Sequence, residues 1–148
     1  MQSQSLIRAV VDAAALRHNL RQVRRVAPDS RVMAVIKANA YGHGLLPAAR
    51  ALAEADGFAV ARIGEGLALR AAGLTNRILL LEGVFSAEQL AAAAQARFEL
   101  MVHSVEQLEL LDALTGDAQV TAWIKVDSGM NRLGFRLVVA LDLGAEHR

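Results

Sequence analysis

A lysine closes a short apolar run in the first third of the chain, and a glycine-rich turn follows it at once. The run, residues 32–36, is rich in β-branched side chains and is typical of a buried strand that ends at Lys37. Partial desolvation there disfavours the ammonium form and leaves the amine available to attack a carbonyl carbon. Gly42 and Gly44 suit a tight turn or a close backbone approach to a ligand. Lys37 is therefore a candidate covalent anchor; the alternative is an ordinary lysine that reaches solvent.

Four segments of the chain carry a recognisable pattern: residues 35–44 (VIKANAYGHG), 64–73 (GEGLALRAAG), 78–83 (ILLLEG) and 123–135 (WIKVDSGMNRLGF). Together, and in this order, they resemble bacterial alanine racemases, which are pyridoxal-phosphate enzymes. Residues 35–44 match that family's cofactor-lysine signature. The resemblance runs from about Ile7 to Arg136, so it covers nearly all of this chain and much less than half of the family's usual enzyme.

The resemblance implies roles for four residues at matching positions. Lys37 matches the lysine that binds pyridoxal 5'-phosphate covalently and then acts as a base on one face of the substrate α-carbon. Tyr41 matches a tyrosine near the cofactor phosphate, and Arg132 matches the arginine that approaches the cofactor's phenolic oxygen and the substrate carboxylate. Lys125 matches a lysine that is carbamylated in some members and then buttresses the arginine. Without the resemblance, Tyr41 is equally well a packed aromatic, and Arg132 is more typical of a surface ion pair.

The family's activity is the interconversion of L-alanine and D-alanine, which supplies D-alanine for peptidoglycan. Its mechanism also needs a second base, a tyrosine from a C-terminal β-rich domain that is reached across a head-to-tail dimer, and Tyr41 is the only tyrosine here. We therefore expect an alanine racemase by lineage whose isolated chain is weakly active or inactive. The alternatives are a non-catalytic fragment or pseudoenzyme that at most binds pyridoxal phosphate, and a broad-specificity amino-acid racemase of the same fold.

Strand-like runs alternate with helical stretches along the chain. The runs begin near residues 32, 58, 78, 98 and 120, which predicts an α/β fold with a mostly parallel sheet. A helix is expected over residues 13–26, and a short strand over residues 8–11. Ser86 and Ser104, each with a glutamine three residues later, predict capping boxes.

Polar side chains follow the ends of these runs, where parallel α/β folds place their ligand sites. These residues are Lys37, Arg62, Glu82, His103, Lys125 and Asp127. Lys125 and Asp127 are expected on one strand face together with Trp123. A strand-end histidine is more often structural than catalytic, so no chemical role is assigned to His103.

The resemblance implies an eight-stranded (β/α)₈ TIM barrel followed by a β-rich domain. Such a barrel needs about 250 residues, and this chain offers about five βα units. We therefore expect residues 1–148 to form a truncated N-terminal barrel domain without the C-terminal domain. Its unpaired strand edge makes self-association or aggregation the expectation, whereas the family forms homodimers. A doubly wound dinucleotide fold is disfavoured because neither residues 42–44 nor residues 64–66 complete its phosphate fingerprint.

Composition limits the remaining classes of function. Sixteen basic and fifteen acidic side chains give a net charge of +1 without a basic block, so nucleic-acid binding has no support. The three arginines at 21, 24 and 25 are interpreted as a solvated helix face. No cysteine is present and the four histidines lack metal-site spacing, so no metal is expected. No apolar run could span a bilayer or act as a secretory signal, which predicts a soluble cytoplasmic protein without a membrane partner.

Overall fold

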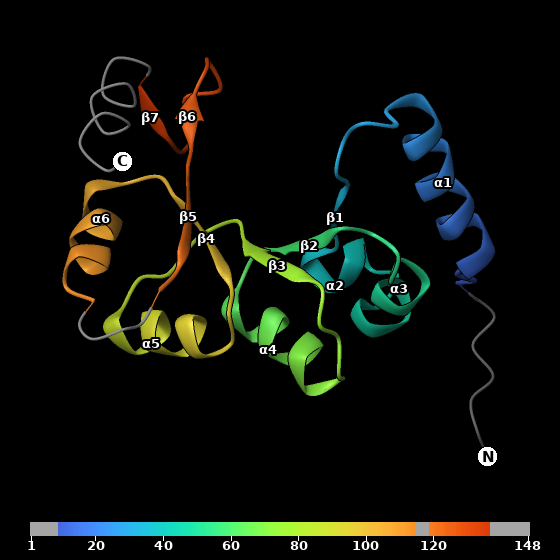
Figure 1. Cartoon of the computed structure of the whole chain (residues 1–148), viewed down its shortest axis with the longest axis horizontal. Helices are drawn as coiled ribbons and strands as arrows, with labels where there is room; N and C mark the ends of the chain where they lie inside the picture. Colours follow the sequence, from blue (N-terminus) through green and yellow to red (C-terminus); the bar gives the residue numbers. More distant parts are fainter. Residues whose placement is uncertain (1–8, 115–118, 137–148) are drawn as a thin grey trace.

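A sheet of five parallel strands forms the centre of the computed structural model, which describes residues 9–114 and 119–136 (Figure 1). Its strands are β1 (Met33–Val35), β2 (Gly57–Val60), β3 (Arg77–Leu80), β4 (Glu99–Val102) and β5 (Thr121–Ile124). Two further short strands, β6 (Val126–Asp127) and β7 (Phe135–Arg136), pair with each other. The helices are α1 (Ala13–Val26), α2 (Lys37–Tyr41), α3 (Leu45–Ala51), α4 (Ile63–Ala71), α5 (Ala87–Gln95) and α6 (Val105–Asp112).

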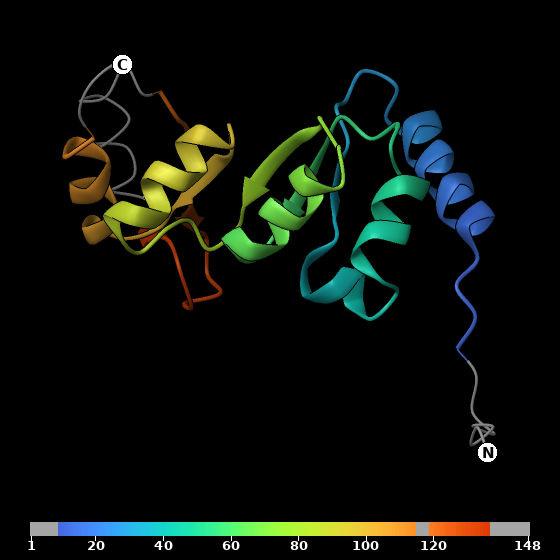
Figure 2. The ribbon, with the colours of Figure 1, turned by 90° about the horizontal axis from the view of Figure 1, so that it is seen from below.

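The strands follow one another in the sheet in the order in which they occur in the chain. Each of β1 to β4 pairs in parallel with the next strand, and helices occupy the connections. Helices α3, α4 and α5 lie in a row along the sheet (Figure 2), and α1 packs against α3. A doubly wound sheet reverses its strand order, and this sheet does not. The expected α/β barrel type is confirmed, as an open sheet of five strands.

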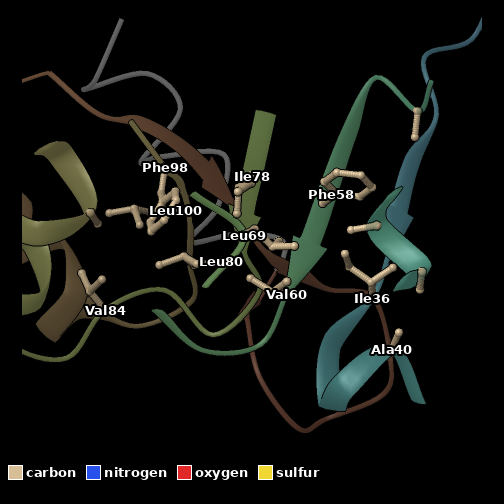
Figure 3. Close-up of a cluster of buried hydrophobic side chains, with 14 of the residues drawn as sticks. Ile36, Ala40, Phe58, Val60, Leu69, Ile78, Leu80, Val84, Phe98 and Leu100 are labelled. Carbon is tan, nitrogen blue, oxygen red and sulfur yellow. The ribbon is translucent and has the colours of Figure 1, made fainter. Parts of the chain in front are cut away.

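Large apolar side chains fill the space between the sheet and the helices (Figure 3). Alternate residues along the central strands point into this space because successive side chains of a strand point to opposite faces. The best-buried members are Phe58, Val60, Leu69, Ile78, Leu80, Phe98 and Leu100. Burying each of them stabilises the fold by about 1.5–3 kcal/mol. Most of the core therefore lies in the central units of the sheet.

A polar cluster lies on the sheet near the starts of the strands. Glu99 is only 8% exposed, and its carboxylate accepts hydrogen bonds from Arg77 Nη2 at 2.9 Å and Trp123 Nε1 at 2.7 Å. Both partners reach it from the strands on either side of β4. Polar clusters at this end of a barrel sheet serve stability, because the chemistry of such folds lies at the opposite end.

The helix starts agree with the sequence in most respects. Helix α1 spans the expected residues, and the Asp12 carboxylate caps it by accepting from the backbone N–H of Ala14 at 2.7 Å. Ser86 Oγ caps α5 by accepting from Gln89 N at 3.3 Å. Ser104 precedes α6 as expected but makes no side-chain cap bond.

Two expectations about strands were wrong. Residues 9–11 form no strand, and Val10 is 74% exposed there. A strand needs a neighbour to accept its backbone hydrogen bonds, and no described strand lies beside this segment. The strand that carries Trp123 also ends at Ile124 instead of running on to Asp127. The loop after Asp127 returns to the Lys125 carbonyl, which accepts from Phe135 N at 2.8 Å, so the chain leaves the main sheet there.

Candidate active site

The carboxyl ends of all five strands meet at one edge of the sheet. Because the strands are parallel, the residues that follow them lie along this edge in strand order. The polar members are Lys37 after β1, Arg62 after β2, Glu82 after β3, His103 after β4 and Lys125 after β5. The sequence-based placement of these residues at strand ends is confirmed.

Lys37 opens a turn of left-handed helix. Residues 38–41 have φ angles between 52° and 56°, although none of them is glycine. Left-handed backbone costs roughly 1–2 kcal/mol for each such residue, so the four residues together store on the order of 4–8 kcal/mol. Strain of this size persists only where the surroundings hold it, and it is concentrated at functional sites. The half-buried Lys37 directly before this turn is therefore a stronger candidate for a site residue than an ordinary strand-end lysine.

Packing and hydrogen bonds hold this turn in place. Ala40 is 5% exposed and lies at one end of the core beside Ile36 (Figure 3), whose carbonyl accepts from Ala40 N at 2.9 Å. Asn39 Oδ1 accepts from Leu45 N at the start of α3, at 2.8 Å. His43 Nδ1 lies 2.8 Å from the Ala40 carbonyl oxygen. Tyr41, at the end of the turn, is 61% exposed, so the reading of it as an aromatic packed behind the lysine is wrong.

The loop that carries Arg132 is organised by an aspartate. Asp127 Oδ1 accepts from the backbone N–H groups of Gly129 and Asn131, both at 3.0 Å. These hydrogen bonds, that of Asn131 first, hold the pKa of Asp127 below its usual value. A Cβ at Gly134 would lie 2.9 Å from Asp127 N, so only glycine lets the loop close this tightly. Arg132 lies in this closed loop with its side chain exposed.

Lys37 and Arg132 stand at opposite ends of the same edge. Lys37 follows β1, whereas Arg132 lies in the loop between β6 and β7, beyond the end of β5, and three strands lie between β1 and β5. With about 4.8 Å between neighbouring strands, β1 and β5 are on the order of 19 Å apart along the sheet. In a closed eight-stranded barrel the first and fifth strands face each other across the axis, which shortens this path. The structure thus puts the two residues on one edge without bringing them into contact.

The middle of the edge is held by side chains that bind backbone. Gln107 is only 3% exposed; its Nε2 donates to the Glu82 carbonyl at 2.8 Å, and its Oε1 accepts from His103 N at 2.9 Å. His103 Nε2 also lies 3.1 Å from the Glu82 carbonyl oxygen. The structural interpretation of His103 therefore agrees with its contacts. The sequence marks Gln107 only as half of a capping box, and nothing in it indicates that Gln107 joins two strand-end loops.

An open groove of about 460 Å³ lies on this edge, next to the strand end that carries Lys37. Arg62, Glu82, Gly83, Phe85 and Gln89 are among the residues that line it, between the ends of β2 and β3. A larger groove, of about 570 Å³, lies between α5 and α6 and is lined by alanine, leucine and glutamine side chains. The first groove has charged groups at a strand-end edge, as a ligand site requires, and the second has none.

The residues along the edge fit a pyridoxal group in their chemistry. In the described part of the chain, no hydrogen bond or ion pair of the Lys37 amine is found, so the amine can bond to an aldehyde carbon. An exposed tyrosine hydroxyl and an exposed guanidinium are available for anionic oxygens. Within residues 9–114 and 119–136, no group of three or more His, Asp or Glu side chains could hold a metal ion. None of the described helices has the length and apolar character to cross a membrane.

Comparison with known proteins points to one family. The family model described as "Alanine racemase, N-terminal domain" matches residues 11–148. The alanine racemase of Yersinia pestis bv. Antiqua (strain Angola) is 57% identical over 128 residues, which are 86% of this chain and 36% of the relative. The biosynthetic alanine racemase of Escherichia coli (strain K12) is 52% identical over 127 residues, with 86% and 35% covered. The chain thus spans about a third of the length of these relatives.

Solved structures agree with this likeness. The crystal structure of biosynthetic alanine racemase from Pseudomonas aeruginosa matches with a TM-score of 0.88 and 45% identity, covering 93% of this chain and 39% of that one. Alanine racemase from Bacillus anthracis with bound L-Ala-P matches with a TM-score of 0.80 and 34% identity, covering 89% and 35%. Both matches show that the open five-stranded sheet has the arrangement found in solved alanine racemases.

Proposed function

Because this chain belongs to the alanine racemase family, we propose that it carries the lysine-bearing part of a site that interconverts L-alanine and D-alanine with pyridoxal 5'-phosphate. Residues 1–148 would then be the first units of an N-terminal barrel domain. The observation that carries the proposal is the position of Lys37, half-buried at a strand end and fixed by a strained left-handed turn. D-Alanine made at such a site would serve peptidoglycan synthesis in the cytoplasm.

Pyridoxal phosphate, when bound, withdraws electrons from the substrate and so makes removal of its α-proton possible. Lys37 Nζ would hold the cofactor's aldehyde carbon and, once freed, would hold or return the α-proton on one face of the substrate. Tyr41 would lie near the phosphate. The Arg132 guanidinium would bind the substrate carboxylate, for which its planar pair of N–H donors is suited.

Lys125 is proposed to be carbamylated. Its backbone joins β5 to the base of the Arg132 loop, because Lys125 N donates to the Val102 carbonyl and the Lys125 carbonyl accepts from Phe135 N, both at 2.8 Å. A Lys125 ammonium would repel the Arg132 guanidinium if the complete site brings them together, whereas a carbamate, formed when the neutral amine adds carbon dioxide and releases a proton, would attract it. Intact mass under carbon dioxide should show one added carboxylate on Lys125. An unmodified Lys125 peptide under these conditions would contradict carbamylation.

The chain supplies one of the two bases that racemisation uses. Its single tyrosine, Tyr41, follows the same strand as Lys37, so it does not provide a base on the opposite face of the substrate. We therefore expect little or no racemisation from the 148-residue protein alone. Racemase turnover by the pure chain would contradict this expectation.

Covalent trapping tests the site directly. Lys37 and Lys125 are the only lysines in the sequence, so each is an internal reference for the other. The purified chain is mixed with pyridoxal phosphate, reduced with borohydride and mapped by peptide mass spectrometry. We expect the adduct at Lys37, its loss in Lys37→Arg and its retention in Lys125→Arg. Equal adducts at the two lysines, or none at Lys37, would contradict the proposed site and favour a non-catalytic fragment.

A further inference from the structure

Helices α4, α5 and α6 begin with the same contact. In each, the side chain at the third helical position accepts a hydrogen bond from the backbone N–H of the residue that precedes the N-cap. The contacts are Glu65 Oε2 with Ala61 N at 2.9 Å, Gln89 Oε1 with Phe85 N at 3.0 Å, and Gln107 Oε1 with His103 N at 2.9 Å. Two of the three side chains are glutamines, so one side-chain oxygen is sufficient for this contact.

Glu65 has a second oxygen, and that oxygen reaches the strained turn. Its Oε2 accepts from Ala61 N and, at 3.2 Å, from Arg62 N, which leaves Oε1 for the backbone N–H of Asn39 at 3.4 Å. Asn39 is the second residue after Lys37 and has a φ of 56°. Its own side chain accepts from Leu45 N at the start of α3. The left-handed turn is thus connected to α4 through Glu65 and to α3 through Asn39.

We propose that Glu65 is a positioning residue for Lys37, through the hydrogen bond from Asn39 N to its second carboxylate oxygen. The proposal rests on the function proposed above for Lys37. The turn stores strain, so each contact that holds it shifts the balance between the left-handed form and relaxed alternatives. A carboxylate offers acceptors on both sides, whereas a glutamine offers one acceptor and one N–H₂ group. Glu65→Gln therefore keeps one of the two contacts and loses the other, at nearly constant shape.

Two matched variants of the full 148-residue chain separate this role from ordinary helix capping. Glu65→Gln removes the second acceptor beside the turn, and Ser86→Ala removes the side-chain cap of α5, where Ser86 Oγ accepts from Gln89 N at 3.3 Å, far from the turn. Amide hydrogen exchange over residues 38–42 reports on the turn without any cofactor. The ratio of the borohydride-trapped pyridoxal phosphate adducts on Lys37 and Lys125 reports on the lysine. Far-UV circular dichroism establishes that both variants are folded.

In Glu65→Gln we expect exchange over residues 38–42 to rise and the Lys37 to Lys125 adduct ratio to fall, each by about 2- to 10-fold, the effect of one lost hydrogen bond. Ser86→Ala should change neither. Unchanged exchange in Glu65→Gln would overturn the proposal, and so would faster exchange with an unchanged adduct ratio, because the turn would then not position the lysine. Equal effects in both variants would show that Glu65 acts only as an ordinary helix cap, which would contradict the proposal. Absence of the Lys37 adduct in the wild-type chain would refute the proposed function, while exchange would still decide whether Glu65 holds the turn.

Discussion

Replacing Gly66 by alanine is expected to destabilise the chain, although glycine is a poor helix former. Gly66 lies in the middle of α4 against the ring of Phe98. An alanine Cβ would lie 2.8 Å from Phe98 Cζ and 3.0 Å from Cε2, closer than side chains pack. The ring cannot move away easily, because Phe98 is 2% exposed and the Arg70 guanidinium lies 5.3 Å from its centroid on one face.

Two opposing effects set the size of the change. Alanine in place of glycine stabilises a helix interior by about 1 kcal/mol, and forcing an extra methyl group into a packed core costs about 1–3 kcal/mol. Since the contact distance requires a shift of a buried ring, the cost should exceed the gain, and we expect a net loss of about 1 kcal/mol. Gly64 in the same helix is the matched control, because nothing lies within 4 Å of its added Cβ. Gly64→Ala should be neutral or should stabilise by up to about 1 kcal/mol.

Urea unfolding followed by far-UV circular dichroism measures both variants, with the slope of the transition checking that the unfolded state is unchanged. A double-mutant cycle adds Phe98→Leu, which removes the ring tip and should cost less stability in the Gly66→Ala background than in the wild type. The reasoning fails if Gly66→Ala is as stable as Gly64→Ala, or if Phe98→Leu has the same cost in both backgrounds.

Two further outcomes are expected. The Arg70 guanidinium donates to three backbone carbonyls beyond the ends of α4 and α5 at 2.8–3.0 Å. Arg70→Ala should therefore lower the free energy of unfolding by about 2–3 kcal/mol. Arg70→Lys should recover only part of this loss, and full recovery would show that the forked set of guanidinium donors is not needed. Backbone hydrogen bonds lower the pKa of Asp127, so its hold on the Arg132 loop should be complete above the ordinary value of ~3.9 and should be lost as pH falls through the lower folded value. The amide shifts of the loop in nuclear magnetic resonance should titrate below ~3.9 in the wild type and not in Asp127→Asn, and a midpoint at or above ~3.9 would contradict the assignment.

The repeating units were predictable because their signals are local. Five β-rich runs, separated from one another by apolar helical stretches, fix the strands to within a residue or two, and Pro28 limits the first helix to the observed α1. Parallel strands then require that Lys37 and Lys125 lie on one edge. These conclusions need only periodicity and the direction of the chain.

The geometry of the site was not predictable in the same way. Ala38 and Ala40 have no preference for left-handed backbone, and only burial of Ala40 and the contacts of Asn39 make that conformation stable. Glu65 lies three residues after an arginine, so the serine or threonine that usually signals a capping box is missing. The break at Lys125 depends on the return of Phe135 to its carbonyl. Each feature is a tertiary contact between segments that give no sign of each other in the sequence.

The sequential order of the strands also bears on how the chain folds while it is being translated. Every strand pairing in the five-stranded sheet joins residues one βα unit apart, such as Met33 with Gly57 or Leu79 with Glu99. Contacts of short range in the chain form quickly, and a chain leaves the ribosome at about 5–20 residues per second. Each strand therefore meets its next partner within seconds of emerging. Assembly of this sheet should keep pace with translation, one unit at a time.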